Sequence, residues 1–251
     1  MQANLSDKLL PDLQQSGRIV FCCGTKRAGK SLLCLSILRQ CLEADLFNDY
    51  IVILGIDPKL EQHNTYQWIK DMANQKSKVG VNVYFGQELH AASLYKHLTD
   101  QKIKSLKDKK TTRKTLLIAD DQTGVQSLFQ ANSAQGSDMV KLLTRVRHFE
   151  MSCIFIVHSV TCVMNSVVKN MCDWFVMMQS PCKKVTDKVW EEWLSRRMPY
   201  DEFNRLVNAT MDKDEFPAII ISTFGGQKYD TNIQNWEWIS KQRKIIMRSL
   251  T

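Results

Sequence analysis

Near the start of the chain, the residue types and their spacing match a loop that binds phosphate groups. Residues 24–31 read Gly-Thr-Lys-Arg-Ala-Gly-Lys-Ser, which fits the pattern G-x-x-x-x-G-K-[ST]. Glycines let successive backbone N–H groups turn toward one anion, and a helix that begins after the loop adds its partial positive charge. An apolar run precedes the motif and an amphipathic segment follows it. This setting favours a phosphate loop over a glycine turn beside a surface lysine.

The lysine and the hydroxyl residue of such a loop have separate roles. We expect Lys30 to reach the β- and γ-phosphates of ATP and the hydroxyl of Ser31 to bind magnesium. The predicted ATP-binding residues are Gly24, Thr25, Lys26, Arg27, Ala28, Gly29, Lys30, Ser31 and Leu32.

Two adjacent carboxylates provide the second half of the predicted site. Asp120 and Asp121 follow the apolar run Thr115–Ala119, and we expect the end of this strand to lie beside the end of the strand that leads to the glycine-rich loop. A strand of this kind lies inside a sheet, and its carboxyl end is where ligands bind in open α/β sheets. We predict that Asp120 binds Mg²⁺, usually through water, and that Asp121 is the base that orients the attacking water. In the simpler alternative, the two aspartates only cap a loop.

Three more side chains are candidates for contact with the γ-phosphate. Arg145 and Arg147 follow a helical pattern, and His158 ends the apolar run Cys153–Val157. A polar side chain at the end of the strand beside the Asp120 strand could sense hydrolysis. The residues alone equally allow a solvated helix end for the arginines and a loop position for the histidine.

Short apolar runs rich in Val, Ile and Phe alternate with helical patterns along the chain. Each run is about five residues long and is bounded by polar or turn residues, which is typical of buried strands. The expected strands are Arg18–Cys23, Tyr50–Leu54, Val81–Phe85, Thr115–Ala119, Cys153–Val157, Trp174–Met178 and Ala218–Ile221. The expected helices are Lys30–Ala44, Tyr66–Asn74, Glu88–Leu106, Ser137–Phe149, Thr186–Arg197 and Tyr200–Met211. This alternation predicts an α/β fold with a mostly parallel central sheet and helices on both faces.

The length of 251 residues is sufficient for one large α/β domain. We expect a P-loop ATPase domain over residues 1–224 and a C-terminal helical tail over residues 225–251, with a final helix at Trp236–Ser249.

The chain carries an excess of positive charge. Its net charge is +8 and its isoelectric point is near 9.0, which favours polyanionic partners, nucleic acid first. The run Lys102–Lys114 contains one acid, Asp108, and is expected on the loop before the Asp120 strand. Such a run is usually a solvated face, but it could also contact the phosphate backbone of DNA without reading its sequence. The second candidate patch is the basic tail, with Lys241, Arg243, Lys244 and Arg248.

The eight cysteines lie mostly within apolar runs, as small hydrophobic residues do, and no Cys-x-x-Cys pair occurs. We therefore expect free thiols in a reducing compartment. The segment Met1–Gln14 is too polar for a signal peptide, and no apolar run approaches the roughly 20 residues that span a bilayer. These features predict a soluble, intracellular protein with no membrane association.

Taken together, the segments resemble the viral genome-packaging ATPases of the FtsK/HerA superfamily, and most closely the poxvirus type with its relatives in large DNA viruses, virophages and Polinton-like elements. The resemblance covers roughly Leu10 to Ile221. Its markers are residues 24–31, residues 55–58 (Gly-Ile-Asp-Pro), residues 66–69 (Tyr-Gln-Trp-Ile), residues 117–121 (Leu-Ile-Ala-Asp-Asp) and residues 147–159, an Arg-His pair before an apolar strand that ends in His-Ser.

The resemblance implies a RecA/FtsK-like P-loop fold and an ATP-hydrolysing translocase that drives double-stranded DNA into a preformed capsid. It implies a homo-oligomeric ring, pentamer or hexamer, that docks on capsid vertex proteins at a virus assembly site in the host cell. An arginine finger acting in trans would be Arg145 or Arg147, and His158 stands where the family usually has a glutamine sensor. Arg27 stands where relatives commonly have a small residue.

Two other classes of function fit parts of the sequence. A small-molecule or nucleoside kinase needs an arginine-rich lid and an acceptor site, but no second acid after Asp120. A nucleotide-dependent assembly protein would bind ATP only to order an oligomer, without turnover.

Overall fold

The computed structural model describes residues 5–15, 17–26, 28–55, 80–85, 89–109, 113–121, 128, 133–158, 160, 166–178, 183–211, 218–222 and 234–235. Within these ranges the chain forms a central sheet whose strand order is β3-β2-β4-β5-β1-β6-β7-β8. The strands are β1 (Ile19–Cys23), β2 (Asp49–Leu54), β3 (Gly80–Phe85), β4 (Thr115–Asp120), β5 (Met151–Val157), β6 (Trp174–Met178), β7 (Ala218–Ser222) and β8 (Gln234–Asn235). All pairings from β3 to β6 are parallel, and both pairings of β7 are antiparallel.

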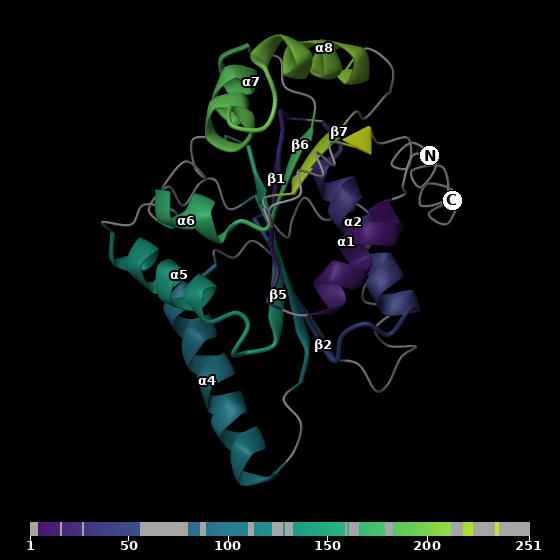
Figure 1. Cartoon of the computed structure of the whole chain (residues 1–251). Coiled ribbons are helices and arrows are strands. Elements are labelled where there is room, and N and C mark those ends of the chain that lie inside the picture. Colours follow the sequence, from purple (N-terminus) through teal and green to yellow (C-terminus); the bar gives the residue numbers. More distant parts are fainter. Residues whose placement is uncertain are drawn as a thin grey trace.

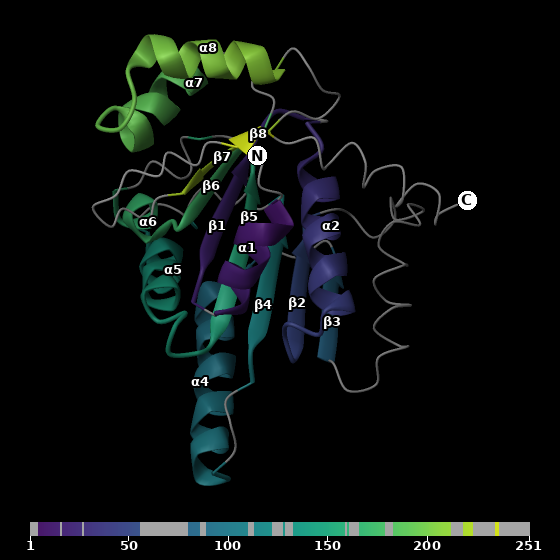
Figure 2. The same ribbon diagram turned by 45° about the vertical axis from the view of Figure 1, so that its right-hand side comes forward.

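Helices cover both faces of this sheet, as Figures 1 and 2 show. The helices are α1 (Leu5–Gln14), α2 (Lys30–Glu43), α4 (Ala91–Lys107), α5 (Ala134–Thr144), α6 (Ser166–Met171), α7 (Lys183–Val189), the π-helix η5 (Trp190–Leu194) and α8 (Tyr200–Met211). Helices α1 and α2 lie on one face, and α4, α5 and α6 lie on the other. Helix α8 lies beyond one end of the sheet, whereas α4 projects past the opposite end (Figures 1 and 2).

Side chains of the central strands alternate between two hydrophobic cores, because successive residues of a strand point to opposite faces. On β1, Val20 and Cys22 belong to the core under α1 and α2, whereas Phe21 belongs to the core under the other helices. Every residue of β1, β4, β5 and β6 is buried. The sheet is therefore a three-layer scaffold whose central strands are fixed on both sides.

The expected strands are confirmed, with ends that differ by at most two residues. The expectation that all of them are buried is wrong for β3, where Asn82 and Tyr84 are exposed. Strand β3 pairs only with β2 within the described sheet, so its apolar run reflects an edge position rather than the interior. Strand β8, with its two residues, was not predicted, and it lies within the expected C-terminal tail.

The helices match the expected patterns less closely. The expected helix Ser137–Phe149 is found as α5, which ends at Thr144 and leaves a turn before β5. The pattern Thr186–Arg197 divides into α7 and η5. Helices α1 and α6 were not predicted. The expected helices Tyr66–Asn74 and Trp236–Ser249 lie outside the described residues. No helix in the described part of the chain combines the length and the apolar character that a membrane crossing requires.

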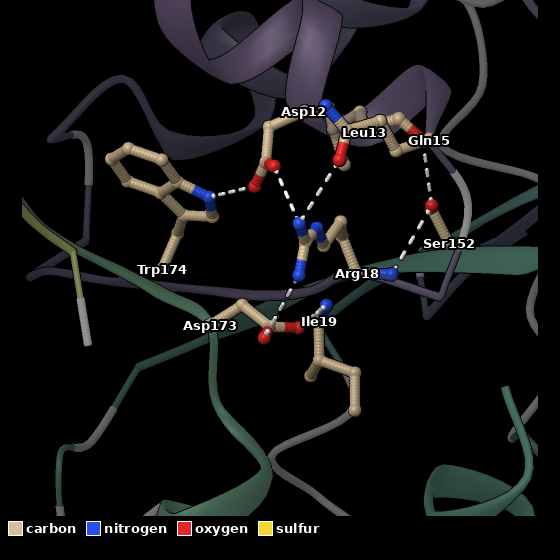
Figure 3. Close-up of polar contacts among 8 residues, drawn as sticks. All are labelled: Asp12, Leu13, Gln15, Arg18, Ile19, Ser152, Asp173 and Trp174. Carbon is tan, nitrogen blue, oxygen red and sulfur yellow. Dashed lines mark hydrogen bonds and ion pairs between the residues drawn. The ribbon is translucent and has the colours of Figure 1, made fainter. Parts of the chain in front are cut away.

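Helix α1 is joined to the amino-terminal end of the sheet by a buried polar network (Figure 3). The guanidinium of Arg18 lies 2.8 Å from Asp12 of α1 and 3.7 Å from Asp173, which precedes β6. The indole N–H of Trp174 donates to the other oxygen of Asp12 at 2.7 Å, and the backbone N–H of Ile19 donates to Asp173 at 2.8 Å. Burial raises the pKa of Asp173, although the Ile19 hydrogen bond and Arg18 oppose this shift. The network therefore fixes the start of β1, the strand that carries the glycine-rich loop at its other end.

Candidate nucleotide-binding site

The glycine-rich loop connects the end of β1 to the start of α2, as the motif predicts. Gly29 has a φ of 83°, a left-handed conformation that favours glycine, and the helix begins at the next residue, Lys30. Of the other predicted loop residues, Ala28 is buried, Lys26 is exposed and Leu32 is half-buried. Arg27 lies outside the described residues. Loop and helix together provide the anion-binding geometry of a helix N-terminus.

The side chain of Lys30 is folded into this loop. Its ammonium donates to the carbonyl oxygens of Gly24 at 2.9 Å and Thr25 at 2.6 Å. Lys30 is only 5% exposed, and burial lowers its pKa, while the carboxylates of Asp120 and Asp121 oppose the shift. The ammonium is therefore within electrostatic range of both predicted carboxylates, and its burial strengthens its attraction for an anion.

Ser31 and Asp120 are in direct contact. The carboxylate of Asp120, at the end of β4, accepts a hydrogen bond from the side chain of Ser31, at the start of α2. Asp120 is 4% exposed, and burial raises its pKa, with the Ser31 hydrogen bond and Lys30 opposing the shift. A hydroxyl and a carboxylate oxygen are hard ligands of the kind that Mg²⁺ prefers. These two side chains could therefore hold one magnesium ion.

The two strands that carry these groups are not neighbours. We expected the ends of β1 and β4 to lie side by side, but β5 lies between them and pairs with both. Ser31 reaches Asp120 because α2 crosses this part of the sheet, where its residues Cys34 and Leu38 line a small space with Ile156 of β5 and residues of β4 and β2. Strand β5 therefore ends between the loop and the two carboxylates, and His158 is the first residue after it.

Asp121 has an unusual backbone and a specific side-chain partner. Its φ of 54° is left-handed, which is uncommon for residues other than glycine. Its carboxylate Oδ1 lies 2.9 Å from Nε2 of His158. The side chain of Asp121 is 46% exposed and that of His158 is 41% exposed, so both are accessible at the carboxyl end of the sheet.

Gly55, which follows β2, completes this arrangement, and the sequence interpretation assigned it no role. Its N–H donates to the carbonyl oxygen of Asp120 at 3.1 Å. A Cβ at this position would lie only 2.6 Å from the carbonyl oxygen of Asp121, so only glycine permits the approach. The sequence signal for this role is a glycine directly after an apolar run, but the sequence does not show which residues lie next to that glycine in the fold.

Arg145 and Arg147 lie at the opposite end of β5 from His158. Both belong to the turn before this strand, whose seven residues span roughly 20 Å. Arg145 donates to the hydroxyl of Tyr95, and its guanidinium carbon lies 5.4 Å from the centre of that ring. The Cγ of Arg147 lies over Gly17, 2.2 Å from where a Cβ there would be. The structure therefore brings Lys30, Ser31, Asp120, Asp121 and His158 together and leaves the two arginines at the other end of the sheet.

Comparison with known proteins supports the same type of fold. No family model matches the sequence, and no curated protein matches it at a significant level. Among solved structures, the chain is similar to the genome packaging NTPase B204 from Sulfolobus turreted icosahedral virus 2. The complex of that protein with AMP gives a TM-score of 0.57 at 18% identity, over 88% of this chain and 96% of that chain. Its complex with ATP-gammaS gives a TM-score of 0.55 at 18% identity, over 88% and 97% of the two chains.

The chain has the fold of a P-loop NTPase. A second solved structure, EssC (ATPases 2 and 3) from Geobacillus thermodenitrificans, is similar with a TM-score of 0.52 at 12% identity, over 94% of this chain and 44% of that chain. The predicted fold class is therefore confirmed, and the likeness to a viral packaging NTPase agrees with the resemblance seen in the sequence.

Within the described residues, no group of three or more His, Cys, Asp or Glu side chains is arranged to hold a metal ion. The NTPase fold needs no such group, because magnesium in these sites is held by one or two side chains together with phosphate oxygens and water. The six described cysteines are buried, and none of them forms a disulfide bond; they are Cys22, Cys23, Cys34, Cys41, Cys153 and Cys172. This agrees with the free thiols expected from the sequence.

Proposed function

We propose that this chain is an ATP-hydrolysing DNA translocase that packages double-stranded viral DNA into a preformed capsid. The contact between Ser31 and Asp120 beside the buried ammonium of Lys30 carries the ATPase part of the proposal. The B204 likeness in fold and the marker segments of the packaging-ATPase family support the packaging part.

The geometry supports a specific role for each residue. The backbone N–H groups at the N-terminus of α2 would bind the phosphates, and Lys30 would stabilise the charge that develops on the β- and γ-phosphates. Ser31 and Asp120 would hold Mg²⁺, which would neutralise charge on the phosphate oxygens. Asp121 accepts a proton from the water that attacks the γ-phosphate.

Arg145 and Arg147 can serve hydrolysis only at the site of another subunit, since β5 separates them from the site of their own chain. Both side chains are exposed, as a finger acting in trans requires. The proposal therefore includes a homo-oligomeric ring with ATP at the subunit interfaces. The ring size, pentamer or hexamer, and the capsid vertex proteins as docking partners come from the family resemblance alone.

The basic run Lys102–Lys114 is a candidate contact for DNA. Lys102, Lys104 and Lys107 belong to the last turns of α4, which agrees with the expected helix Glu88–Leu106, whereas the expected loop position of the run Lys102–Lys114 is wrong for these three residues. This end of α4 projects past the sheet (Figure 1). A projecting basic helix suits sequence-independent contact with the phosphate backbone.

ATP turnover with and without duplex DNA tests the proposal. We expect magnesium-dependent turnover that duplex DNA stimulates, and we expect Lys30→Ala to abolish it because the phosphates lose their buried counterion. Lys141→Ala, an exposed lysine of α5 on the other face of the sheet, is the control and should retain turnover. Turnover only with a small acceptor would make the chain a kinase, and ATP binding without turnover would make it an assembly protein.

The trans arginine is tested by mixing subunits. A Lys30→Ala chain and an Arg145→Ala or Arg147→Ala chain are each expected to be inactive, and their mixture is expected to recover part of the activity. Recovery requires that an intact arginine of one subunit acts at the intact loop of its neighbour. A mixture as inactive as its components would give no support for the arginine substituted in it.

A further inference from the structure

We infer that His158 is a positioning residue for the base, holding the carboxylate of Asp121 in the orientation that water activation needs. This inference rests on the proposed ATPase function. It assigns His158 a task at Asp121, whereas the resemblance implied contact with the γ-phosphate. The observation that carries it is the distance of 2.9 Å between Nε2 of His158 and Oδ1 of Asp121.

A partner that orients the carboxylate of Asp121 matters because this side chain lies at an exposed strand end. The carboxylate is 46% exposed, and the residue follows the end of β4 in a left-handed conformation. A side chain at an exposed strand end samples several rotamers, and a displacement of about 1 Å from the productive geometry can cost about 100-fold in rate.

The backbone of Asp121 is already fixed from the other side. Gly55 donates to the carbonyl oxygen of Asp120 and lies so close to the carbonyl of Asp121 that no Cβ fits between them. Gly55 therefore determines where the Cα of Asp121 lies, and His158 determines where its carboxylate points. The two contacts come from β2 and β5, the two strands that flank β4.

The contact with His158 involves one of the two oxygens of the base. When Nε2 of His158 donates to Oδ1, the oxygen Oδ2 of Asp121 can accept the proton of a water molecule. The neighbouring charges are compatible with separate roles for the two oxygens of Asp121. Asp120 accepts the hydrogen bond of Ser31, and the ammonium of Lys30 attracts Asp121 from the loop side. Any side chain that donates one N–H from the same place should perform the same task.

Substitution of His158 separates this role from contact with phosphate. His158→Ala should lower kcat for ATP hydrolysis by about 10- to 100-fold and leave the affinity for ATP within about twofold, because orientation is lost and phosphate contacts remain. His158→Gln, which keeps an N–H donor, should recover most of the rate. His148→Ala, an exposed histidine in the turn before β5, is the control and should match the unmodified chain.

Two further measurements make the test specific. In an Asp121→Asn background, His158→Ala should cause no further loss of rate, because both changes act through the same carboxylate. Crystal structures without nucleotide should show one ordered rotamer of Asp121 in the unmodified chain and a disordered carboxylate in His158→Ala.

Three outcomes would overturn the inference: an unchanged kcat in His158→Ala, a loss of ATP affinity at constant kcat, or a His158→Gln variant as slow as His158→Ala. The last two would instead indicate a phosphate contact or a requirement for imidazole itself. These results differ from failure of the proposed function, which would be seen as an unmodified chain that does not hydrolyse ATP.

Discussion

The side chain of Ser31 donates a hydrogen bond to the carboxylate of Asp120, although a whole strand separates the strands that lead to them. The contact depends on the path of α2 across β5 and on the loop that turns the chain into α2 at Gly29. Ser31 and Asp120 together would hold a divalent ion, which would neutralise charge on bound phosphates. Because the two side chains contact each other, a substitution of either residue should change the position of the other.

Ser31→Ala removes one of the two protein groups that we assign to magnesium. We expect the magnesium-dependent affinity for ATP to fall by about 10- to 100-fold, since a hydrogen bond to a charged group contributes about 1.5–3 kcal/mol. Ser31→Thr keeps the hydroxyl and should bind normally. Titration of a fluorescent ATP analogue with and without Mg²⁺ measures the difference. An alanine variant that binds as well as the threonine variant would show that Ser31 is not a magnesium ligand.

The stability of the chain without nucleotide should depend on pH through Asp120. Burial raises the pKa of this carboxyl, so the native state holds the proton more tightly than the unfolded chain does. The contribution of Asp120 to stability is therefore most favourable below the unfolded value of about 3.9 and decreases as the pH rises through the higher folded value. Asp120→Asn removes this penalty and should raise Tm relative to the unmodified chain more at pH 8 than at pH 4.

Calorimetry across this range checks the prediction, with Asp201→Asn, an exposed aspartate of α8, as the baseline for the loss of one charge. A Tm difference for Asp120→Asn that stays constant from pH 4 to pH 8 would contradict it. The stabilised variant should also lack ATP turnover, because the carboxylate that costs stability is the one that the metal needs.

The network around Arg18 should contribute to stability and not to nucleotide binding. Trp174→Phe leaves one oxygen of Asp12 without its indole partner, which we expect to cost about 1–3 kcal/mol, or roughly 2–4 °C in Tm for each kcal/mol. The affinity for ATP should not change, because the network lies at the other end of β1 from the loop. Arg39→Ala, which removes a pair between neighbouring turns of α2, is expected to cost less than about 0.5 kcal/mol. Equal losses of stability in Trp174→Phe and Arg39→Ala would show that the network around Arg18 contributes no more than an exposed ion pair.

The sequence alone located the strands and the phosphate loop because both depend on local patterns. Five residues of one apolar class bounded by turn residues predict a buried strand such as β6 without knowledge of its neighbours. The loop is equally local, since residues 24–31 carry the glycines, the lysine and the hydroxyl in one stretch. The adjacent Asp120 and Asp121 were found for the same reason.

What the sequence did not provide is the set of contacts between distant segments. The order of the strands places β5 between β1 and β4, and this order is fixed by packing across the whole sheet. The pair of His158 with Asp121 and the approach of Gly55 both follow from that order. Helix α1 was missed because its polar residues suggest a free segment, although Asp12 is bonded to Arg18 and Trp174.

The projecting end of α4 offers a test of the DNA contact. Lys104 and Lys107 are exposed near the end of the helix, and Lys183 and Lys184 are an equally exposed pair at the start of α7. If α4 contacts the phosphate backbone, Lys104→Glu with Lys107→Glu should weaken binding of any duplex regardless of sequence. The slope of log K against log salt should decrease by about 2, since each phosphate contact contributes about 0.9.

The same charge reversal at Lys183 and Lys184 leaves the net charge equal to that of the α4 variant, so it controls for a general electrostatic effect. ATP turnover is measured for each variant with and without duplex DNA, and only the α4 variant should lose the stimulation. Equal weakening by both variants would show that DNA responds to overall charge alone. Weakening by the α7 variant alone would place the DNA at the end of the sheet that carries the ATP site, because Lys183 and Lys184 follow the carboxyl end of β6, while α4 projects from the opposite end.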